Sequence, residues 1–198
     1  GAGKWYRPLR PDCPYGAAAE TNIVYGGDRA GPWGYRGGSV FLDPAAPEAE
    51  RFKVIYLARA PVAELADFIA AHPESVSPWP PRAERAWVVA GAVSPDGRRW
   101  TRRPAPLLVH FSDTQHIAYY DAERQRYVAY LSTWTLGRRS VGRAEGAAFG
   151  PLAAPETVLW PGADVGASDT WYGHARTSYP GAPEYHLLFP HRWHLAAD

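Results

Sequence analysis

Apolar residues in this chain occur in short runs of strand length, separated by polar turns. The chain contains 20 prolines and 19 glycines, and these residues interrupt the sequence every few positions. Short apolar runs bounded by such turn signals are typical of β-strands. The pattern therefore predicts an all-β fold, with strands over residues 5–9, 22–25, 39–42, 51–57, 85–94, 99–103, 116–120, 127–134, 140–145, 156–160, 170–177 and 184–189.

One stretch departs from the strand pattern. Residues 61–72 place Val62, Leu65, Ala66 and Ile69 on one helical face. A proline at the first position suits the first turn of a helix, and a proline directly after the stretch ends it. We expect a short helical insert near residues 61–72, between two strands of one unit.

A repeated phrase sets the predicted architecture. Ser112-Asp113-Thr114-Gln115 opens one segment, and Ser168-Asp169-Thr170-Trp171 opens another 56 residues later (169 − 113 = 56). An apolar run, a polar turn and a second apolar run follow each phrase, and residues 38–57 repeat this frame without the acid. Repetition of four-stranded units at roughly 40–50 residues is the signature of propeller blades. We therefore expect a single domain over residues 1–198, a partial β-propeller of about two full blades with flanking strands.

Asp113 and Asp169 are the first candidates for chemistry. In a propeller, an acid just before the first strand of a blade faces the central channel, so acids from neighbouring blades converge there. Glycoside cleavage requires two carboxyl groups that flank one bond. The alternative is that each Ser-Asp-Thr phrase is a local hydrogen-bonded cap or turn. Glu145, beside Arg143, is a third candidate catalytic acid, with a structural ion pair as its alternative role.

Other side chains supply candidate contacts to a sugar. The chain holds 9 tryptophans and 12 tyrosines, whose flat apolar faces and polar handles suit sugar rings; burial between blades is their alternative role. Arginine is a good bidentate donor, and a histidine in the channel could bond a hydroxyl. The predicted substrate-binding residues are Gln115, Arg139, Arg143, Trp171 and His174.

Three further aspartates are assigned to turns. Asp43 and Asp121 both fall at the far end of the first strand of their units, and this equivalence favours a structural role. Asp96 lies in Pro95-Asp96-Gly97, which is a strong turn signal.

The composition limits the classes of partner that we expect the chain to bind. Formal net charge is +1, so a nucleic-acid surface is not predicted, and no apolar run reaches the length of a membrane span. Cys13 has no second cysteine with which to form an internal disulfide. The histidines show no metal-ligand spacing, so we predict neither a metal nor a cofactor. The chain begins in the middle of the pattern, so we expect the rest of the propeller to be missing from it, and the compartment stays open.

Several phrases, in order along the chain, resemble a known group of bacterial proteins. They are residues 22–24, 39–53, 94–100, 112–115, 127–130 and 137–145, followed by Tyr179-Pro180-Gly181. Together they are similar to the five-bladed β-propellers of glycoside hydrolase families 32 and 43. The resemblance implies a funnel-shaped sugar-binding channel, with Asp113 as a channel acid and Asp169 at the corresponding place one blade later. It also implies that this chain lacks the first and the C-terminal blades. The Arg-Asp-Pro and Glu-Cys motifs of family 32 are absent, and Leu42-Asp43-Pro44 matches the first of these motifs only in part.

Three functions are compatible with these sequence features. The first is a glycoside hydrolase-like propeller that acts on an oligosaccharide by carboxylate acid/base chemistry. The second is a non-catalytic carbohydrate-binding propeller with the same aromatic surface. The third is an interaction scaffold, which predicts neither sugar binding nor a cluster of acids.

Overall fold

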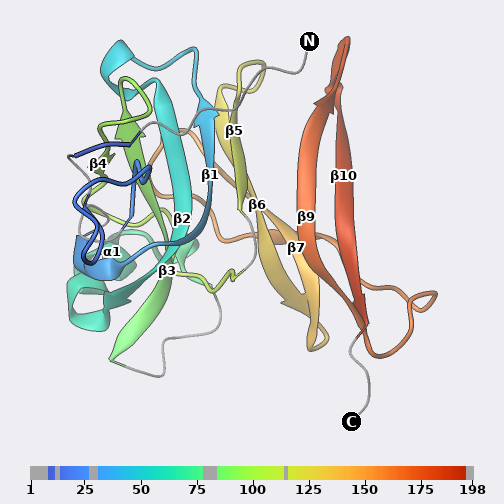
Figure 1. Cartoon of the computed structure of the whole chain (residues 1–198). Coiled ribbons are helices and arrows are strands. Elements are labelled where there is room, and N and C mark those ends of the chain that lie inside the picture. Colours follow the sequence, from blue (N-terminus) through green and yellow to red (C-terminus); the bar gives the residue numbers. More distant parts are fainter. Residues whose placement is uncertain (1–8, 12–13, 27–30, 78–83, 114–115, 195–198) are drawn as a thin grey trace.

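The computed structural model describes residues 9–11, 14–26, 31–77, 84–113 and 116–194 (Figure 1). Over these described residues the fold is mostly β, with 51% of them in strands, one short α-helix and several antiparallel sheets, none of which is closed. The predicted all-β class is therefore confirmed. The strand predicted over residues 5–9 lies almost entirely outside the described residues, and the one predicted over residues 22–25 is wrong, since Thr21 instead pairs with Arg10 in an isolated bridge.

The described strands form two four-stranded meanders and one hairpin. In each meander, strands that follow one another in sequence are antiparallel neighbours. The first sheet contains β1 (Arg36–Leu42), β2 (Phe52–Pro61), β3 (Arg85–Ser94) and β4 (Thr101–Arg102); the second contains β5 (Ile117–Asp121), β6 (Arg126–Thr135), β7 (Arg138–Gly146) and β8 (Glu156–Leu159); the hairpin contains β9 (Asp169–Tyr179) and β10 (Ala182–His194).

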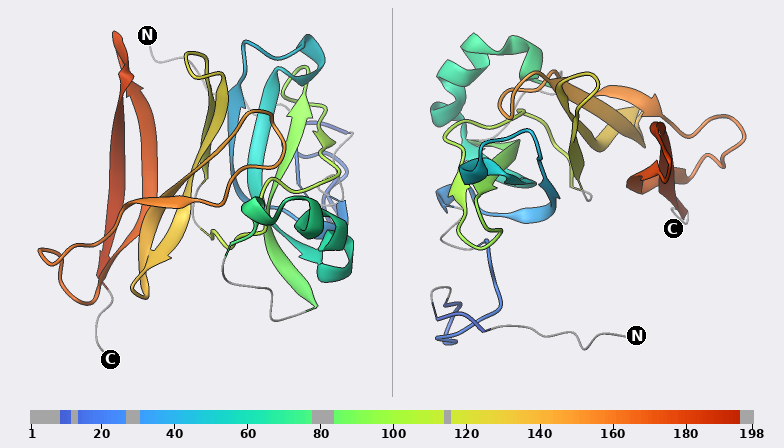
Figure 2. Two further views of the ribbon diagram at one scale, coloured as in Figure 1. Left: turned by 180° about the vertical axis from the view of Figure 1, so that it is seen from behind. Right: turned by 90° about the horizontal axis from the view of Figure 1, so that it is seen from above.

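The three sheets lie one after another (Figures 1 and 2). Each interface between them contains a cluster of apolar side chains. Ile55 and Val89 of the first sheet pack with Leu131 of the second in one cluster. Val128 and Tyr130 of the second sheet pack against Leu188 of β10 in another. Because β2 and β3 are covered on both faces, their residues form nearly continuous apolar runs rather than alternating ones.

The predicted helical insert is present between β2 and β3. A 3₁₀ turn, η3 (Val62–Leu65), leads into α1 (Ala66–Ala71), and a second one, η4 (Pro73–Ser75), follows. Leu65 and Phe68 are buried against the outer face of the first sheet. The insert therefore covers a face that the second sheet does not reach. A further 3₁₀ turn, η2 (Glu48–Glu50), lies between β1 and β2.

Asp43 forms a buried ion pair within the first sheet and accepts a hydrogen bond from the second sheet. It lies 3.1 Å from Lys53 Nζ, both side chains are almost completely buried, and the Tyr127 hydroxyl donates to it over 2.6 Å. Burial alone raises the pKa of the Asp43 carboxyl, but the hydrogen bond from Tyr127 and the charge of Lys53 outweigh it and hold the pKa below its ordinary value. The structural role predicted for Asp43 is confirmed.

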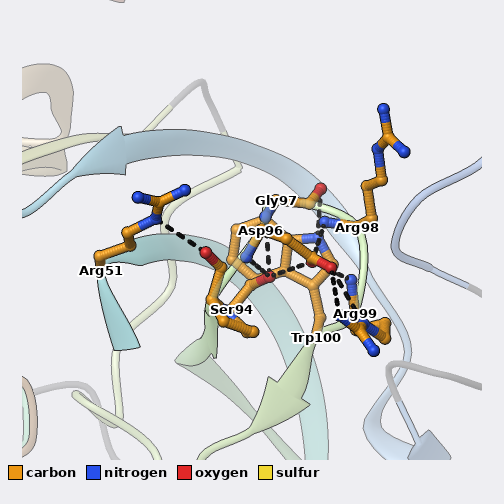
Figure 3. A network of polar contacts seen from close by, with 8 residues as sticks. Arg51, Ser94, Asp96, Gly97, Arg98, Arg99 and Trp100 are labelled. Carbon is orange, nitrogen blue, oxygen red and sulfur yellow. Dashed lines mark hydrogen bonds and ion pairs between the residues drawn. The ribbon is translucent and has the colours of Figure 1, made fainter. Parts of the chain in front are cut away.

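Asp96 organises the turn between β3 and β4 (Figure 3). Its Oδ1 accepts hydrogen bonds from the backbone nitrogens of Arg98 and Arg99 at 2.9 and 2.8 Å, and its Oδ2 accepts one from Arg99 Nε. The two backbone donors, followed by the Arg99 side chain, lower the pKa of Asp96. Asp121 does the same in its own turn, where it accepts from Arg124 N. Both aspartates therefore have the turn role that the sequence predicts.

Candidate functional site

The candidate site lies at one end of all three sheets, which is the lower end in Figure 1. The strands β2, β6 and β10 finish at this end, and β3, β7 and β9 begin there. The segment of residues 111–113, which precedes β5, also reaches this end, where it contacts Trp87, Trp134 and Arg139. Side chains that are distant in sequence are therefore brought together by the register of the sheets.

Two cross-strand pairs of arginine and tryptophan occupy equivalent places in the first two sheets. Arg59 of β2 is directly opposite Trp87 of β3, and its guanidinium lies 5.0 Å from the centre of the indole ring. Trp134 of β6 is directly opposite Arg139 of β7, at 5.1 Å. A guanidinium at this distance from an aromatic face forms a cation–π interaction. Each sheet thus presents the same pair, with the order of the two residues exchanged.

Phe111 joins the two pairs across the boundary between the sheets. Its ring lies 5.3 Å from the ring of Trp87 and 5.4 Å from the ring of Trp134, with which it is almost parallel at 13°. Beyond Trp134, the Arg139 guanidinium also lies 4.8 Å from the Tyr172 ring, at the beginning of β9. The Tyr172 ring is 4.3 Å from that of Trp193.

These contacts form one continuous series across all three sheets, here named the aromatic–arginine row. Arg59 and Trp193 are exposed at its two ends, and the members between them are partly exposed. Partly exposed aromatic rings combine flat apolar faces with polar edges. The aromatic–arginine row consists of Arg59, Trp87, Phe111, Trp134, Arg139, Tyr172 and Trp193.

Asp113 lies beside this row. Both of its carboxylate oxygens accept from Arg139, one of them at 3.1 Å from Nη2. The Asp113 side chain is 34% exposed and the Arg139 side chain 16%. The structure thus brings together two residues that the sequence predicted for the site, an acid and an arginine, in a bidentate ion pair.

Asp169 is placed differently, although its phrase is the same. It is the first residue of β9 and lies directly opposite His194 of β10. Its carboxylate is only 1% exposed, and it accepts from His194 Nδ1 at 2.6 Å and from Arg192 Nε at 2.5 Å. The hydrogen bond from His194, followed by the contacts with Arg192, holds the pKa of Asp169 below its ordinary value. This carboxylate is therefore ionised and does not face solvent.

Glu145 lies at the opposite end of the second sheet. It forms an ion pair with Arg143, and a longer one of 3.9 Å with Arg126. It lies six positions along β7 from Arg139, the partner of Asp113, and six steps along a strand span about 20 Å. Carboxyl groups that share one glycosidic bond lie about 5–9.5 Å apart. The structure therefore separates Glu145 from Asp113 by too much for these two to act on one bond.

Three of the remaining predicted residues do not lie on the row. His174 is buried, and Trp171 packs in the interface between the second sheet and the hairpin. Arg143 is paired with Glu145, and Gln115 lies outside the described residues. Their role as substrate contacts stays a prediction.

The buried His174 belongs to a group of three histidines inside the molecule. His116 is 0% exposed, and neither of its ring nitrogens has a hydrogen-bond partner among the described residues. Burial lowers the pKa of His116 to about 3, and the charges of His174 and His110 act in the same direction. His110, in contrast, bonds Ser77 Oγ at 2.9 Å and the Ser132 carbonyl at 2.7 Å.

A pocket of about 330 Å³ opens at the Arg59 end of the row. Trp87 and Arg59 contribute to its wall, together with Arg36, Arg85 and Tyr35. A second pocket, of about 390 Å³, lies near the turn between β5 and β6 and is lined by both acidic and basic side chains.

Two negative findings apply to the part of the chain that the structure describes. Its histidine, cysteine and carboxylate side chains form no group of three that could hold a metal ion. Its helical segments include none with the length and apolar character that crossing a membrane requires.

Comparison with known proteins gave no relative. No family model, no curated protein and no solved structure matches the chain. The resemblance to glycoside hydrolase propellers therefore stays an expectation, and the geometry of the site carries the functional argument.

Proposed function

We propose that this chain binds an oligosaccharide along the aromatic–arginine row, as a non-catalytic propeller module. The observation that carries the proposal is the continuity of the row, in which five aromatic rings and two guanidinium groups follow one another over three sheets at steps of 4.3–5.4 Å. Flat apolar faces suit the apolar faces of sugar rings, and the guanidinium groups between them supply donors for hydroxyls.

The propeller architecture is part of this proposal. Two antiparallel four-stranded meanders pack side by side, and in both of them the first strand begins at the same end of the sheet. These two meanders correspond to two blades. The hairpin of β9 and β10 corresponds to the beginning of a third. In this arrangement the row lies on the face that carries the channel mouth.

Binding without catalysis is favoured over hydrolysis by the state of the three candidate acids. Asp169 is buried and ionised, and Glu145 is distant from Asp113. A general acid of a glycosidase requires a raised pKa, whereas the pKa of Asp169 is lowered. None of the three pairings that these acids could form thus supplies the two carboxyl groups that the reaction requires.

Isothermal titration with xylo-, fructo- and galacturono-oligosaccharides tests the proposal. We expect Trp193→Ala, which removes the exposed ring at the end of the row, to weaken binding about five- to ten-fold, as the loss of one aromatic contact implies. Tyr185→Ala removes an exposed ring of β10 that does not belong to the row, and serves as the control. An unchanged affinity in Trp193→Ala, or an equal loss in both variants, contradicts the proposal.

Hydrolysis is the second candidate, and the partly exposed carboxylate of Asp113 beside the row favours it. In this case Asp113 acts together with a second acid that is not Asp169 or Glu145. A reducing-sugar assay with the wild-type chain and Asp113→Asn separates the two candidates. Product that is released by the wild type and lost in Asp113→Asn favours hydrolysis, and binding without product favours the binding module.

A further inference from the structure

The pocket beside Trp87 concentrates positive charge at one end of the row. Two guanidinium groups lie against the same indole ring, that of Arg59 at 5.0 Å and that of Arg36 at 5.4 Å from its centre. Arg85 also lines the pocket and donates to the carbonyl oxygens of Pro32 and Arg59. Three arginines thus share a pocket of about 330 Å³.

The charge of Arg36 and Arg59 is not neutralised by the described residues. No ion pair joins either guanidinium to a carboxylate in that part of the chain. Arg139, in the equivalent pair of the second sheet, is matched by Asp113. Glu64 touches the lining of the pocket, but its carboxylate accepts from the Trp33 indole nitrogen at 2.8 Å.

The chemistry of the pocket fits an anionic group attached to a flat ring. Guanidinium groups recognise planar oxyanions through paired N–H donors, and charge-assisted hydrogen bonds of this kind are stronger than neutral ones. Tyr35 and Trp87 add aromatic surface to the same wall. The volume lies at the lower end of the range for small-ligand pockets, which is appropriate for one sugar unit rather than a large cofactor.

We infer that this pocket is an anion subsite that binds the acidic group of a charged sugar, so that the ligand of the row is an acidic oligosaccharide. The inference rests on the proposed sugar-binding function and specifies its ligand class. A carboxylate of a uronic acid and a sulfate ester present the same oxyanion chemistry to the arginines. The remaining sugar units lie on the rings from Phe111 to Trp193.

Titration with matched acidic and neutral ligands tests the inference. The probes are hexamers of galacturonate and of mannuronate with their methyl esters, and a sulfated galactan hexamer with its desulfated form. We expect the acidic member of at least one pair to bind about ten-fold more tightly than its neutral partner, because charge-assisted hydrogen bonds replace neutral contacts. The uronate and sulfate pairs distinguish the two sources of the anion.

The double variant Arg36→Gln/Arg59→Gln tests whether the preference for acidic ligands arises in the arginine pocket. We expect the ratio of acidic to neutral affinity to fall towards one in this variant, with an unchanged melting temperature as evidence of folding. Arg98→Gln is the matched control, because Arg98 is an exposed arginine whose side chain points away from the β3–β4 turn at the opposite end of the first sheet (Figure 3). A ratio that stays high in the double variant overturns the inference.

The outcomes separate the two proposals. Equal binding of acidic and neutral partners overturns the anion subsite and leaves the sugar-binding function standing. Absence of binding by every probe overturns both. A single-stranded oligonucleotide is included because bases also stack on aromatic rings beside arginines, and its tighter binding contradicts both the subsite and the sugar assignment.

Discussion

Acidification is expected to destabilise the fold through His116. The imidazole is completely buried, without a hydrogen-bond partner among the described residues, and its pKa is lowered to about 3. In the unfolded chain its pKa is about 6.5. Below this value the unfolded state binds a proton that the folded state does not, so stability falls as the pH falls, until it approaches the folded pKa.

The size of the effect follows from the width of this pH window. Each pH unit between the unfolded and folded pKa values costs about 1.4 kcal/mol. Because the unfolded histidine is already half protonated at pH 6.5, the free energy of unfolding decreases by about 2.3 kcal/mol between pH 6.5 and pH 4.5 from His116 alone. The lowered pKa values of His110 and His174 add to the loss in the same direction, whereas Asp113 opposes the shift at His116.

Urea unfolding, followed by tryptophan fluorescence at pH 7.0 and pH 4.5, measures this loss. His116→Leu removes the titrating ring, so the difference between the two pH values should be smaller than in the wild type by about 2–3 kcal/mol. His191→Gln changes an exposed histidine and is the control. An equal pH dependence in the wild type and in His116→Leu would refute the reasoning, because it would mean that His116 is protonated alike in the folded and unfolded states.

Three further outcomes follow from the packing and the charges. Lys53→Met leaves the buried Asp43 carboxylate without its partner and should lower the free energy of unfolding by about 3–5 kcal/mol, with partial recovery in Lys53→Met/Asp43→Asn, as urea denaturation can measure. Gly91→Ala places a Cβ at 2.7 Å from Leu107 Cδ1 and should lower the free energy of unfolding by about 1–3 kcal/mol. A variant as stable as the wild type in the same assay would show that the segment containing Leu107 moves freely. Binding of an acidic oligosaccharide should weaken as NaCl is raised from 20 to 300 mM, since salt screens exposed charges, and a salt-independent affinity would speak against the arginine pocket.

The strands could be predicted because their sequence signals are local. Apolar runs between glycine, proline and aspartate turns indicate where each strand begins and ends, and both meanders form from neighbours in the sequence. The turn roles of Asp43, Asp96 and Asp121 were also accessible, because an aspartate between two apolar runs bonds nearby backbone. The same local logic failed for residues 22–25, which form no strand in the part of the chain that the structure describes.

The equivalence of Asp113 and Asp169 could not be judged from their shared phrase. Asp169 is within β9, opposite His194, whereas Asp113 precedes β5 by four positions and meets Arg139 from another strand. The environment of each acid is set by side chains that are distant in sequence. Repetition predicted where the two acids lie in their units, and only the register revealed which of them is exposed.

The aromatic–arginine row was missed for the same reason. A cation–π pair between β2 and β3 requires that Arg59 and Trp87 be opposite each other. The register of two strands that are separated by an insert cannot be predicted from a local sequence pattern. One signal was present, since Trp87 lies close to the beginning of β3 and Trp134 close to the end of β6, in each case next to the connection between the second and third strands of a sheet. Phe111, directly before the first Ser-Asp-Thr phrase, was a second signal.

The most direct test of the sugar-binding row is an NMR titration of the tryptophan side chains. The chain has 9 tryptophans, and each indole N–H gives its own signal in a ¹⁵N-labelled sample. On addition of galacturono- or xylo-hexaose, we predict that the signals of Trp87, Trp134 and Trp193 shift together, with one dissociation constant, while those of Trp100 and Trp171, which lie outside the row and the pocket, stay in place. Signals that do not move with either sugar, or shifts confined to tryptophans outside the row, would contradict the account.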